Sequence, residues 1–288
     1  MDIQARIETG LAAALDRAAG PDCPPRLAAA LRHAVTPGGA RVRPQLCLAV
    51  AAACGDRDPA LSEAAAAALE LLHCASLVHD DLPAFDDAHE RRGQPSVHAA
   101  YGEPLAILAG DALIVLAFET VARAAAGSPA RLPALMSILA GAVGAPGGIA
   151  AGQAWESEPE VQLDLYHRSK TGALFVGATM AGAVSAGADP GPWRRLGEMI
   201  GEAYQVADDL LDAVGDEAAG KPCGQDAARS RPSAVTALGV RGAVALLERR
   251  VAEAAEAVPH CKGADGLRKL VCAQAKRLVP KTLAVSAA

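Results

Sequence analysis

Residues 61–87 read LSEAAAAALELLHCASLVHDDLPAFDD, and this stretch decides the fold class of the chain. From Leu61 to Leu72 it is apolar on nearly every side of a helix, and Ala and Leu are strong helix formers. A helix of that composition lies in the middle of a bundle. Pro83 ends or distorts the helix within a turn, because proline lacks the N–H of the helical ladder. We therefore expect a buried central helix that ends in a cluster of aspartates.

The rest of the chain has the same helical character. Hydrophobic residues make up 51% of the 288 residues, charged residues 21% and aromatic residues only 3%, which excludes disorder and favours helices over strands. Ala173–Ala186 is again apolar on nearly all sides, and no run of β-branched or aromatic residues bounded by turns occurs. Glycine and proline separate the helical segments, and no low-complexity linker divides them. The sequence predicts a single all-α domain, a helical bundle, over residues 1–288.

The charge and the cysteines narrow the class of function. There are 27 Lys and Arg against 33 Asp and Glu, and the net charge of −6 argues against nucleic-acid binding. The 7 cysteines are scattered and include no Cys-x-x-Cys pair, so neither a disulfide framework nor a zinc ribbon is expected. Acidic residues stand near the N-terminus where a secretory signal carries basic and then apolar residues. We therefore expect a cytoplasmic protein.

One uncharged stretch, Leu132–Trp155, is long enough to span a bilayer. Its many Gly and Ala residues dilute its hydropathy, and Pro146-Gly147-Gly148 interrupts it. We interpret it as two buried helices, and we expect no integral membrane protein.

Two aspartate clusters follow directly on apolar helical segments. Spacings of three and four residues place the acids of the second cluster on one side of a helix, where like charges repel unless a cation neutralises them. Magnesium suits such a site, because it binds one or two carboxylates and takes its other ligands from water and substrate phosphate. The predicted metal ligands are Asp80, Asp81 and Asp86 in the first cluster and Asp208, Asp209 and Asp212 in the second.

Other interpretations of acidic clusters are weaker here. Either cluster alone could be a solvated helix end or an incidental calcium site, but the EF-hand spacing is absent. A di-iron centre needs two Glu-x-x-His pairs, and we identify only Glu70 and His73. Lysines and arginines also flank both clusters, and any one of them alone would be interpreted as an ordinary surface residue. Together with metal-binding acids they indicate a diphosphate site.

On these motifs the chain resembles the trans-isoprenyl diphosphate synthases, and among them the bacterial geranylgeranyl diphosphate synthases of carotenoid and photosynthetic-pigment pathways. The resemblance covers nearly the whole chain, with Asp80-Asp81-Leu82-Pro83-Ala84-Phe85-Asp86 as the first aspartate-rich motif and Asp208-Asp209-Leu210-Leu211-Asp212 as the second. It implies an all-α homodimer of the isoprenoid synthase type with one central cavity per subunit. It also implies three Mg²⁺ ions between the two motifs, with isopentenyl diphosphate and an allylic diphosphate as substrates.

The resemblance also implies roles for individual cations and polar residues. The residues matching those that bind the allylic diphosphate or stabilise the nascent cation are Lys170, Thr171, Gln205, Lys221 and Arg91. Of these, the resemblance implies a catalytic role for Lys170, Thr171 and Gln205. The residues matching the isopentenyl diphosphate pocket are Arg43, His73 and Arg92.

Three positions depart from the family pattern. Ala40 stands where a lysine contacts isopentenyl diphosphate, so either Arg41 or another cation compensates or that affinity is lower. Arg231 replaces a lysine expected to bind substrate, which preserves charge but not shape. Glu156 replaces a shorter aspartate near the metals.

Product length is expected to depend on the helix before Asp80. In the family a bulky aromatic at the place of Ala75 goes with fifteen-carbon products, so the small Ala75 favours twenty carbons. Ser76 lies beside it and Leu72, one turn deeper, is a candidate floor; Ala75 could also be plain core filling.

The expected activity is thus the condensation of isopentenyl diphosphate with farnesyl diphosphate to all-trans geranylgeranyl diphosphate. The alternatives are a farnesyl diphosphate synthase, a non-catalytic regulatory subunit and a class I terpene cyclase. The two intact motifs argue against the regulatory subunit, and the isopentenyl diphosphate residues argue against the cyclase.

Overall fold

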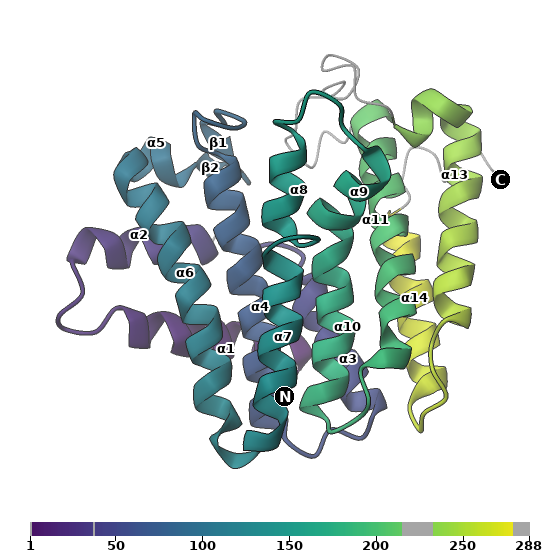
Figure 1. Ribbon diagram of the computed structural model, residues 1–288, viewed down its shortest axis with the longest axis horizontal. Helices are drawn as coiled ribbons and strands as arrows, with labels where there is room; N and C mark the ends of the chain where they lie inside the picture. Colours follow the sequence, from purple (N-terminus) through teal and green to yellow (C-terminus); the bar gives the residue numbers. More distant parts are fainter. Residues whose placement is uncertain (1, 37, 215–232, 279–288) are drawn as a thin grey trace. The chain divides into compact units, whose positions relative to one another are not determined.

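The computed structural model describes residues 2–36, 38–214 and 233–278, which are almost entirely helical (Figure 1). This confirms the all-α class. The elements in chain order are α1 (Ile3–Ala18), α2 (Pro25–Val35), α3 (Val42–Ala53), α4 (Pro59–Asp80), β1 (Glu90–Arg91), β2 (Gln94–Pro95), α5 (Val97–Tyr101), α6 (Glu103–Ala124), η1 (Ala125–Gly127), η2 (Pro129–Arg131), α7 (Leu132–Val143), α8 (Ile149–Trp155), α9 (Leu163–His167), η3 (Arg168–Gly172), α10 (Ala173–Ser185), η4 (Gly191–Trp193), α11 (Arg194–Val214), α13 (Ala234–Glu256) and α14 (Ala264–Leu278).

The chain forms two compact units, each with its own core. The first takes in the residues up to Ala140 together with Met180–Asp189, and the second takes in Gly141–Thr179 and the described residues from Pro190 on. Helices α7 and α10 contribute residues to both units. The single domain over residues 1–288 stays a prediction.

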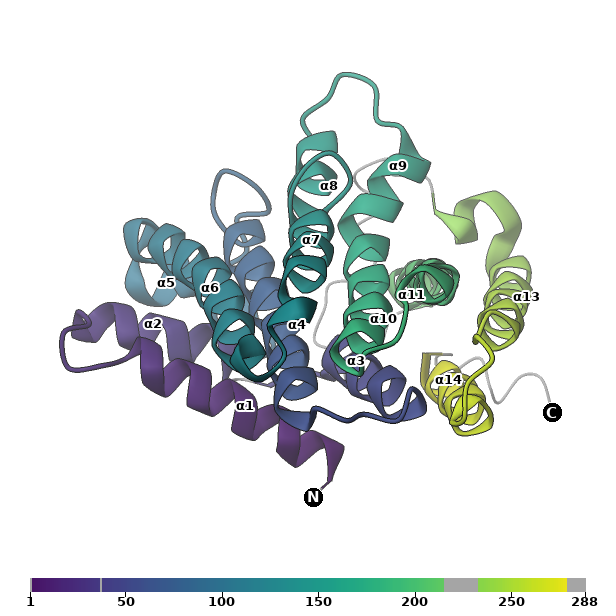
Figure 2. The same cartoon turned by 60° about the horizontal axis from the view of Figure 1, so that its bottom comes forward.

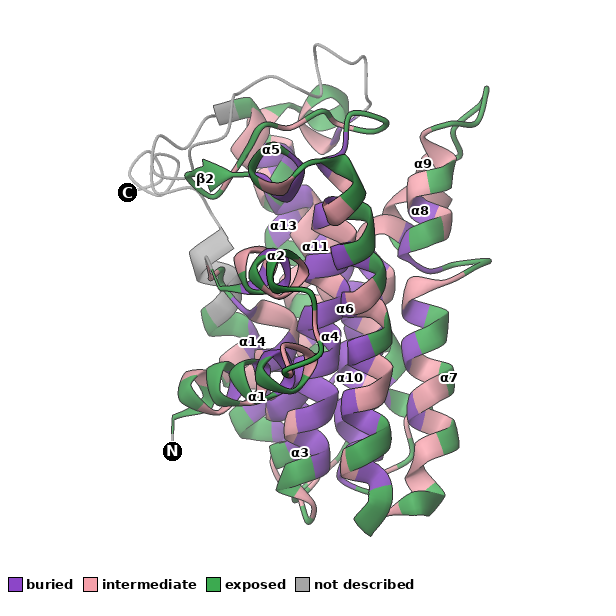
Figure 3. Cartoon of the chain, turned by 90° about the vertical axis from the view of Figure 1, so that its left-hand side faces the viewer, coloured by how far each residue is buried: buried purple, intermediate pink, exposed green. Residues whose placement is uncertain are grey.

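Helix α4 is the centre of the first unit. It packs against α3 and α6, while α1 and α2 lie across these helices (Figure 2). Its buried residues include most of Leu61–Leu72, on all sides of the helix, which confirms the buried central helix (Figure 3). Asp58 caps its N-terminus by accepting a hydrogen bond from the N–H of Leu61 at 3.3 Å, and Pro59 fits the first turn, where no helical N–H is needed.

The core of the second unit is formed where α11 packs on α13. Helix α7 ends at Val143 and α8 begins at Ile149, so the break expected at Pro146-Gly147-Gly148 is present. The buried apolar cluster consists of Ala203, Val206, Ala207 and Leu210 from α11 with Ala243 and Leu247 from α13.

Two helical stretches of the described chain, Pro59–Asp80 and Glu103–Gly127, are long and apolar enough to cross a membrane by length and composition. The most apolar window of α4 is 72% buried, as a core helix requires. The corresponding window of Glu103–Gly127 is only 44% buried, so α6 keeps apolar side chains outside the core.

Candidate active site

The first aspartate motif lies where α4 ends, at Asp80. The chain turns back around Pro83, and the N–H of Asp86 donates to the carbonyl of Asp80 over 3.0 Å. Both residues are half-buried. The turn therefore brings a second acidic residue next to the helix end, a donor set that suits a hard divalent cation.

Asp81 differs from its neighbour, because it is only 2% exposed. Both of its carboxylate oxygens accept hydrogen bonds from Arg91, with nitrogen–oxygen distances of 2.5–2.8 Å. Burial alone would lower the pKa of Arg91, but the hydrogen bond to Asp81 and the charges of Asp80 and Asp86 raise it, so Arg91 stays charged. The sequence predicts that Asp81 binds metal and that Arg91 binds diphosphate; the structure pairs them with each other.

Arg91 and Arg92 belong to a small hairpin, β1–β2, that the sequence analysis did not predict. Its two-residue turn has positive φ at both positions, 56° at Arg92 and 74° at Gly93, as the tightest hairpin turns require. The Arg92 guanidinium lies against Gly39 and donates to the carbonyl of Gly38. A Cβ on Gly39 would lie 2.7 Å from the guanidinium carbon, so a larger residue there would displace the end of the Arg92 side chain.

Arg43 and His73, two of the residues expected to bind isopentenyl diphosphate, meet in the first unit. The Nη1 atom of Arg43 lies 3.5 Å from Nε2 of His73. The pKa of His73 is well below its ordinary value, first because burial disfavours the imidazolium and then because arginines surround it. These arginines are Arg43, Arg92, Arg91 and Arg41. His73 is therefore neutral at physiological pH amid a concentration of positive charge that favours a bound anion.

Arg41 does not take the place expected for it. Its side chain is fully buried and forms ion pairs with Glu8 at 2.9 Å and Glu70 at 2.8 Å. It also donates to the carbonyl of Val35 at 2.8 Å. Burial alone would lower the pKa of Arg41, but these two carboxylates raise it above its ordinary value. The structure thus commits Arg41 to joining α1, α2 and α4, at odds with a role in compensating for Ala40.

We expect Arg41→Met to lower the free energy of unfolding by about 3–5 kcal/mol, measured by urea denaturation. The reason is that Glu70, 2% exposed, would keep a buried charge without its main partner. The double variant Arg41→Met, Glu70→Gln should recover much of the loss, since it removes that charge too. A single variant as stable as the parent would show that this ion pair is not structural.

The second aspartate motif lies near the end of α11. Asp208 is exposed, Asp212 is half-buried and Asp209 is buried, so the three acids predicted on one side of the helix differ in environment. Asp209 stands at the edge of that side and accepts from the N–H of Ala234, at the start of α13, at 2.7 Å. Asp209 is buried, as Asp81 is, whereas Asp208 and Asp212 are more accessible and are therefore the better candidates for metal.

Asp209 also orients the predicted catalytic glutamine. The side-chain amide of Gln205 donates to Asp209 at 3.0 Å, and its carbonyl oxygen accepts from the hydroxyl of Thr171 at 3.0 Å. The structure thus brings Thr171 and Gln205 together, as expected for residues of one site, with both ends of the amide held.

Lys170 lies next to Thr171 in η3, a π-helical turn of a kind often found at functional sites. Helix α8 approaches this turn closely, because a Cβ on Gly152 would lie 2.5 Å from the backbone nitrogen of Lys170. The ammonium of Lys170 lies 2.6 Å from Oε1 of Glu156. The glutamate that departs from the family pattern is therefore in direct contact with a predicted catalytic cation.

The predicted chain-length residues lie inside the first unit. Ala75 and Leu72 are each 1% exposed, and Ser76 is half-buried with its hydroxyl donating to the carbonyl of His73 at 2.7 Å. Their role in product length stays a prediction. Lys221 and Arg231 lie outside the described residues.

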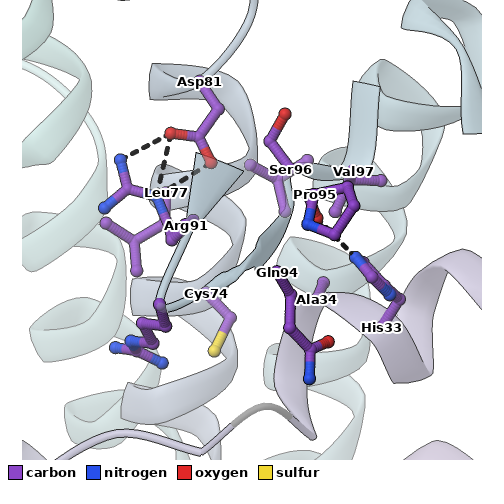
Figure 4. A pocket seen from close by; sticks show the side chains of 12 residues that line it. His33, Ala34, Cys74, Leu77, Asp81, Arg91, Gln94, Pro95, Ser96 and Val97 are labelled. Carbon is purple, nitrogen blue, oxygen red and sulfur yellow. Dashed lines mark hydrogen bonds and ion pairs between the residues drawn. The ribbon is translucent and has the colours of Figure 1, made fainter. Parts of the chain in front are cut away.

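A cavity of about 30 Å³ opens between α2, the end of α4 and the hairpin, enough for one or two water molecules. Figure 4 shows Asp81 and Arg91 facing each other in its wall, with His33 bonded to the carbonyl of Pro95 opposite. The cavity is too small for a prenyl diphosphate. The larger central cavity that the resemblance implies stays a prediction.

Within the described part of the chain, no three His, Cys, Asp or Glu side chains are grouped as a ready-made metal site. The carboxylates at Asp80, Asp86, Asp208 and Asp212 are oxygen donors that are not enclosed in the core. Such donors fit Mg²⁺, which completes its shell with water and substrate phosphate.

Two residues that the sequence did not single out support predicted site residues, one in each unit. His98 is buried and its Nδ1 atom lies 3.2 Å from the carbonyl oxygen of Asp81, which holds the motif from behind. Tyr166 donates its hydroxyl to Glu156 at 2.6 Å. The available signal for His98 was a polar residue beside the apolar Val97, Ala99 and Ala100, whereas Tyr166 lies among polar residues and had no such signal.

Comparison with known proteins identifies the family. A family model described as polyprenyl synthetase matches residues 24–263. The chain is 56% identical to a geranylgeranyl diphosphate synthase of Cereibacter sphaeroides, over 99% of each chain, and 52% identical to one of Rhodobacter capsulatus, over 97% of each. Its structure is similar to that of an FPP/GFPP synthase from Zymomonas mobilis, with a TM-score of 0.80 and 29% identity, covering 93% of this chain and 95% of that one. The chain belongs to the polyprenyl synthetase family.

Proposed function

We propose that the chain is a prenyltransferase that condenses isopentenyl diphosphate with farnesyl diphosphate to give all-trans geranylgeranyl diphosphate. The observation that carries this proposal is the contact of Arg43 with neutral His73, with Arg92 nearby, next to the aspartate motif at the end of α4. Cations beside metal-binding acids suit a substrate that carries a diphosphate. The family and the names of its similar members support the same reaction.

The described residues divide the work of the reaction. Arg43, Arg92 and His73 bind isopentenyl diphosphate, and Lys170 and Thr171 bind the allylic diphosphate. Bound Mg²⁺, three ions by the family resemblance, would neutralise charge on the departing diphosphate. The allylic C–O bond breaks with its electron pair on the diphosphate, and the double bond of isopentenyl diphosphate attacks the cation. Loss of a proton to the released diphosphate completes the product, while the Gln205 amide, held at both ends, keeps a fixed dipole near the cation.

An assay of the purified chain tests this proposal. With Mg²⁺, farnesyl diphosphate and labelled isopentenyl diphosphate, we expect a twenty-carbon diphosphate on chromatography. Elongation of a geranyl but not a farnesyl primer would identify a farnesyl diphosphate synthase. No product from any primer would indicate a regulatory subunit, and a hydrocarbon formed without isopentenyl diphosphate would indicate a cyclase.

We further propose that the protein is a homodimer that pairs through α6. Ile107, Leu108 and Val115 are 46%, 52% and 67% exposed, and the seven-residue spacing of Leu108 and Val115 puts them on one stripe of the helix. A second copy of the chain that covered this stripe would explain why so apolar a helix is so little buried.

A Leu108→Glu, Val115→Glu double variant should shift the molar mass from dimer to monomer in size-exclusion chromatography with light scattering, because burying two charges opposes association. The exposed Val161→Glu in the second unit is the matched control. A parent chain that is monomeric at every concentration would contradict the proposal.

We also propose that the protein is cytoplasmic. The family resemblance further suggests a role in carotenoid biosynthesis, which uses a twenty-carbon diphosphate. The support for the location is that none of the six cysteines in the described residues forms a disulfide. Cell fractionation tests the location.

A further inference from the structure

Lys170 is held by two neighbours before any substrate arrives. Its Nζ atom lies 2.6 Å from Oε1 of Glu156, and the same oxygen accepts the hydroxyl of Tyr166 at 2.6 Å. The ammonium also lies 5.7 Å from the centre of the Tyr166 ring, within the range of a cation–π contact. The three side chains thus form one contact set within the second unit.

These contacts are partly shielded from water. The side chains of Lys170 and Glu156 are only 22% and 19% exposed, so their attraction is screened less than that of a surface pair. The backbone is held as well, because α8 meets η3 at Gly152 with no room for a side chain. The fold thus fixes the backbone of Lys170, and Glu156 holds its ammonium.

An incoming diphosphate needs the same ammonium that Glu156 holds. A negative group next to Lys170 weakens the binding of a second anion there, because the two anions compete for the ammonium and repel each other. The Tyr166 hydroxyl reduces this competition, since it donates to the very oxygen that Lys170 contacts and takes up part of its charge. The strength of the counter-ion thus depends on Tyr166.

We infer that Glu156 and Tyr166 form an internal counter-ion for Lys170, which positions the ammonium and sets the affinity of the site for the allylic diphosphate. This inference rests on the proposed function. Glu156 and Tyr166 are positioning residues, because they act on the substrate through Lys170. One oxygen of Glu156, Oε1, contacts both Lys170 and Tyr166.

Calorimetric titration with farnesyl thiolodiphosphate, an unreactive analogue, in the presence of Mg²⁺ tests the inference. Glu156→Gln should lower the Kd of the analogue about fivefold, because the competing charge is gone. Its kcat should fall about tenfold, because Lys170 loses its positioning partner. Tyr166→Phe should raise the Kd about threefold, because Glu156 then holds Lys170 more strongly.

The decisive measurement is the combination of the two changes. In the Glu156→Gln background, Tyr166→Phe should leave the Kd unchanged, because the hydroxyl acts only through the carboxylate. A Tyr166→Phe effect that persists there would mean direct contact with substrate and would overturn the inference. Glu156→Asp, which keeps the charge, should bind the analogue within about twofold of the parent; binding as tight as that of Glu156→Gln would equally contradict it.

Controls separate this inference from the proposed function. Glu158→Gln removes a charge at an exposed position two residues away and should change neither Kd nor kcat. A parent chain without prenyltransferase activity would defeat the proposed function. An active parent whose Kd is unaltered by Glu156→Gln would defeat the inference alone, whether or not the melting temperature changes.

Discussion

Asp80→Ala and Asp208→Ala are each expected to reduce turnover about a thousandfold while the helical circular dichroism stays unchanged. Asp80 is half-buried and Asp208 is exposed, so their removal takes away a metal ligand without emptying core volume. Each change also relieves repulsion between neighbouring carboxylates. The melting temperature without Mg²⁺ should therefore be equal to or higher than that of the parent.

The neighbouring aspartates provide the matched controls. Asp81→Ala leaves Arg91, which is largely enclosed, without its bidentate partner, and should lower the free energy of unfolding by about 3 kcal/mol. Asp209→Ala should also destabilise, because it removes the hydrogen bonds to Gln205 and to the N–H of Ala234. Near-normal activity of both Asp80→Ala and Asp208→Ala at limiting Mg²⁺ would show that the two-motif metal site is wrong.

The contrast between Asp80 and Asp81 shows how far the sequence can predict the site. Composition and periodicity are sufficient for the buried helix α4, for its end near Pro83 and for the break before Gly148, because these depend on local propensity and on the missing N–H of proline. Adjacent aspartates look alike in a sequence. That Asp81 is buried against Arg91 depends on the hairpin that carries Arg91 back to it, a contact across the turn that no local pattern encodes.

Arg41 illustrates the same limit. Charged residues are seldom fully buried, so an arginine after a glycine pair is naturally interpreted as a substrate ligand. It is buried because Glu8 and Glu70, 33 and 29 residues away in sequence, converge on it. The partnership of Glu156 with Tyr166 and Lys170 is closer in sequence, but it needs the path from α8 through α9 into the π-helical turn of η3.

Ala75→Phe is expected to limit the main product to fifteen carbons, while a geranyl primer is still extended by one unit. Ala75 lies five residues before Asp80 on α4, about 7.5 Å along the helix, and is 1% exposed. A ring at this position would occupy the path of a tail that grows along α4 from the diphosphate end. Chromatography of products from geranyl and farnesyl primers, in one enzyme preparation, measures the change.

Ala68→Phe is the control that separates a blocked path from a damaged core. Ala68 is fully buried and lies seven residues earlier on α4, two turns deeper on the same side of the helix. Overpacking at either position costs about 1–3 kcal/mol of stability, and a weakened core depresses every condensation alike. Only Ala75→Phe should discriminate by length, extending the geranyl primer and rejecting the farnesyl primer. A folded Ala75→Phe enzyme that still makes mainly the twenty-carbon diphosphate would mean that the tail does not pass Ala75, and that this residue serves only the packing of α4.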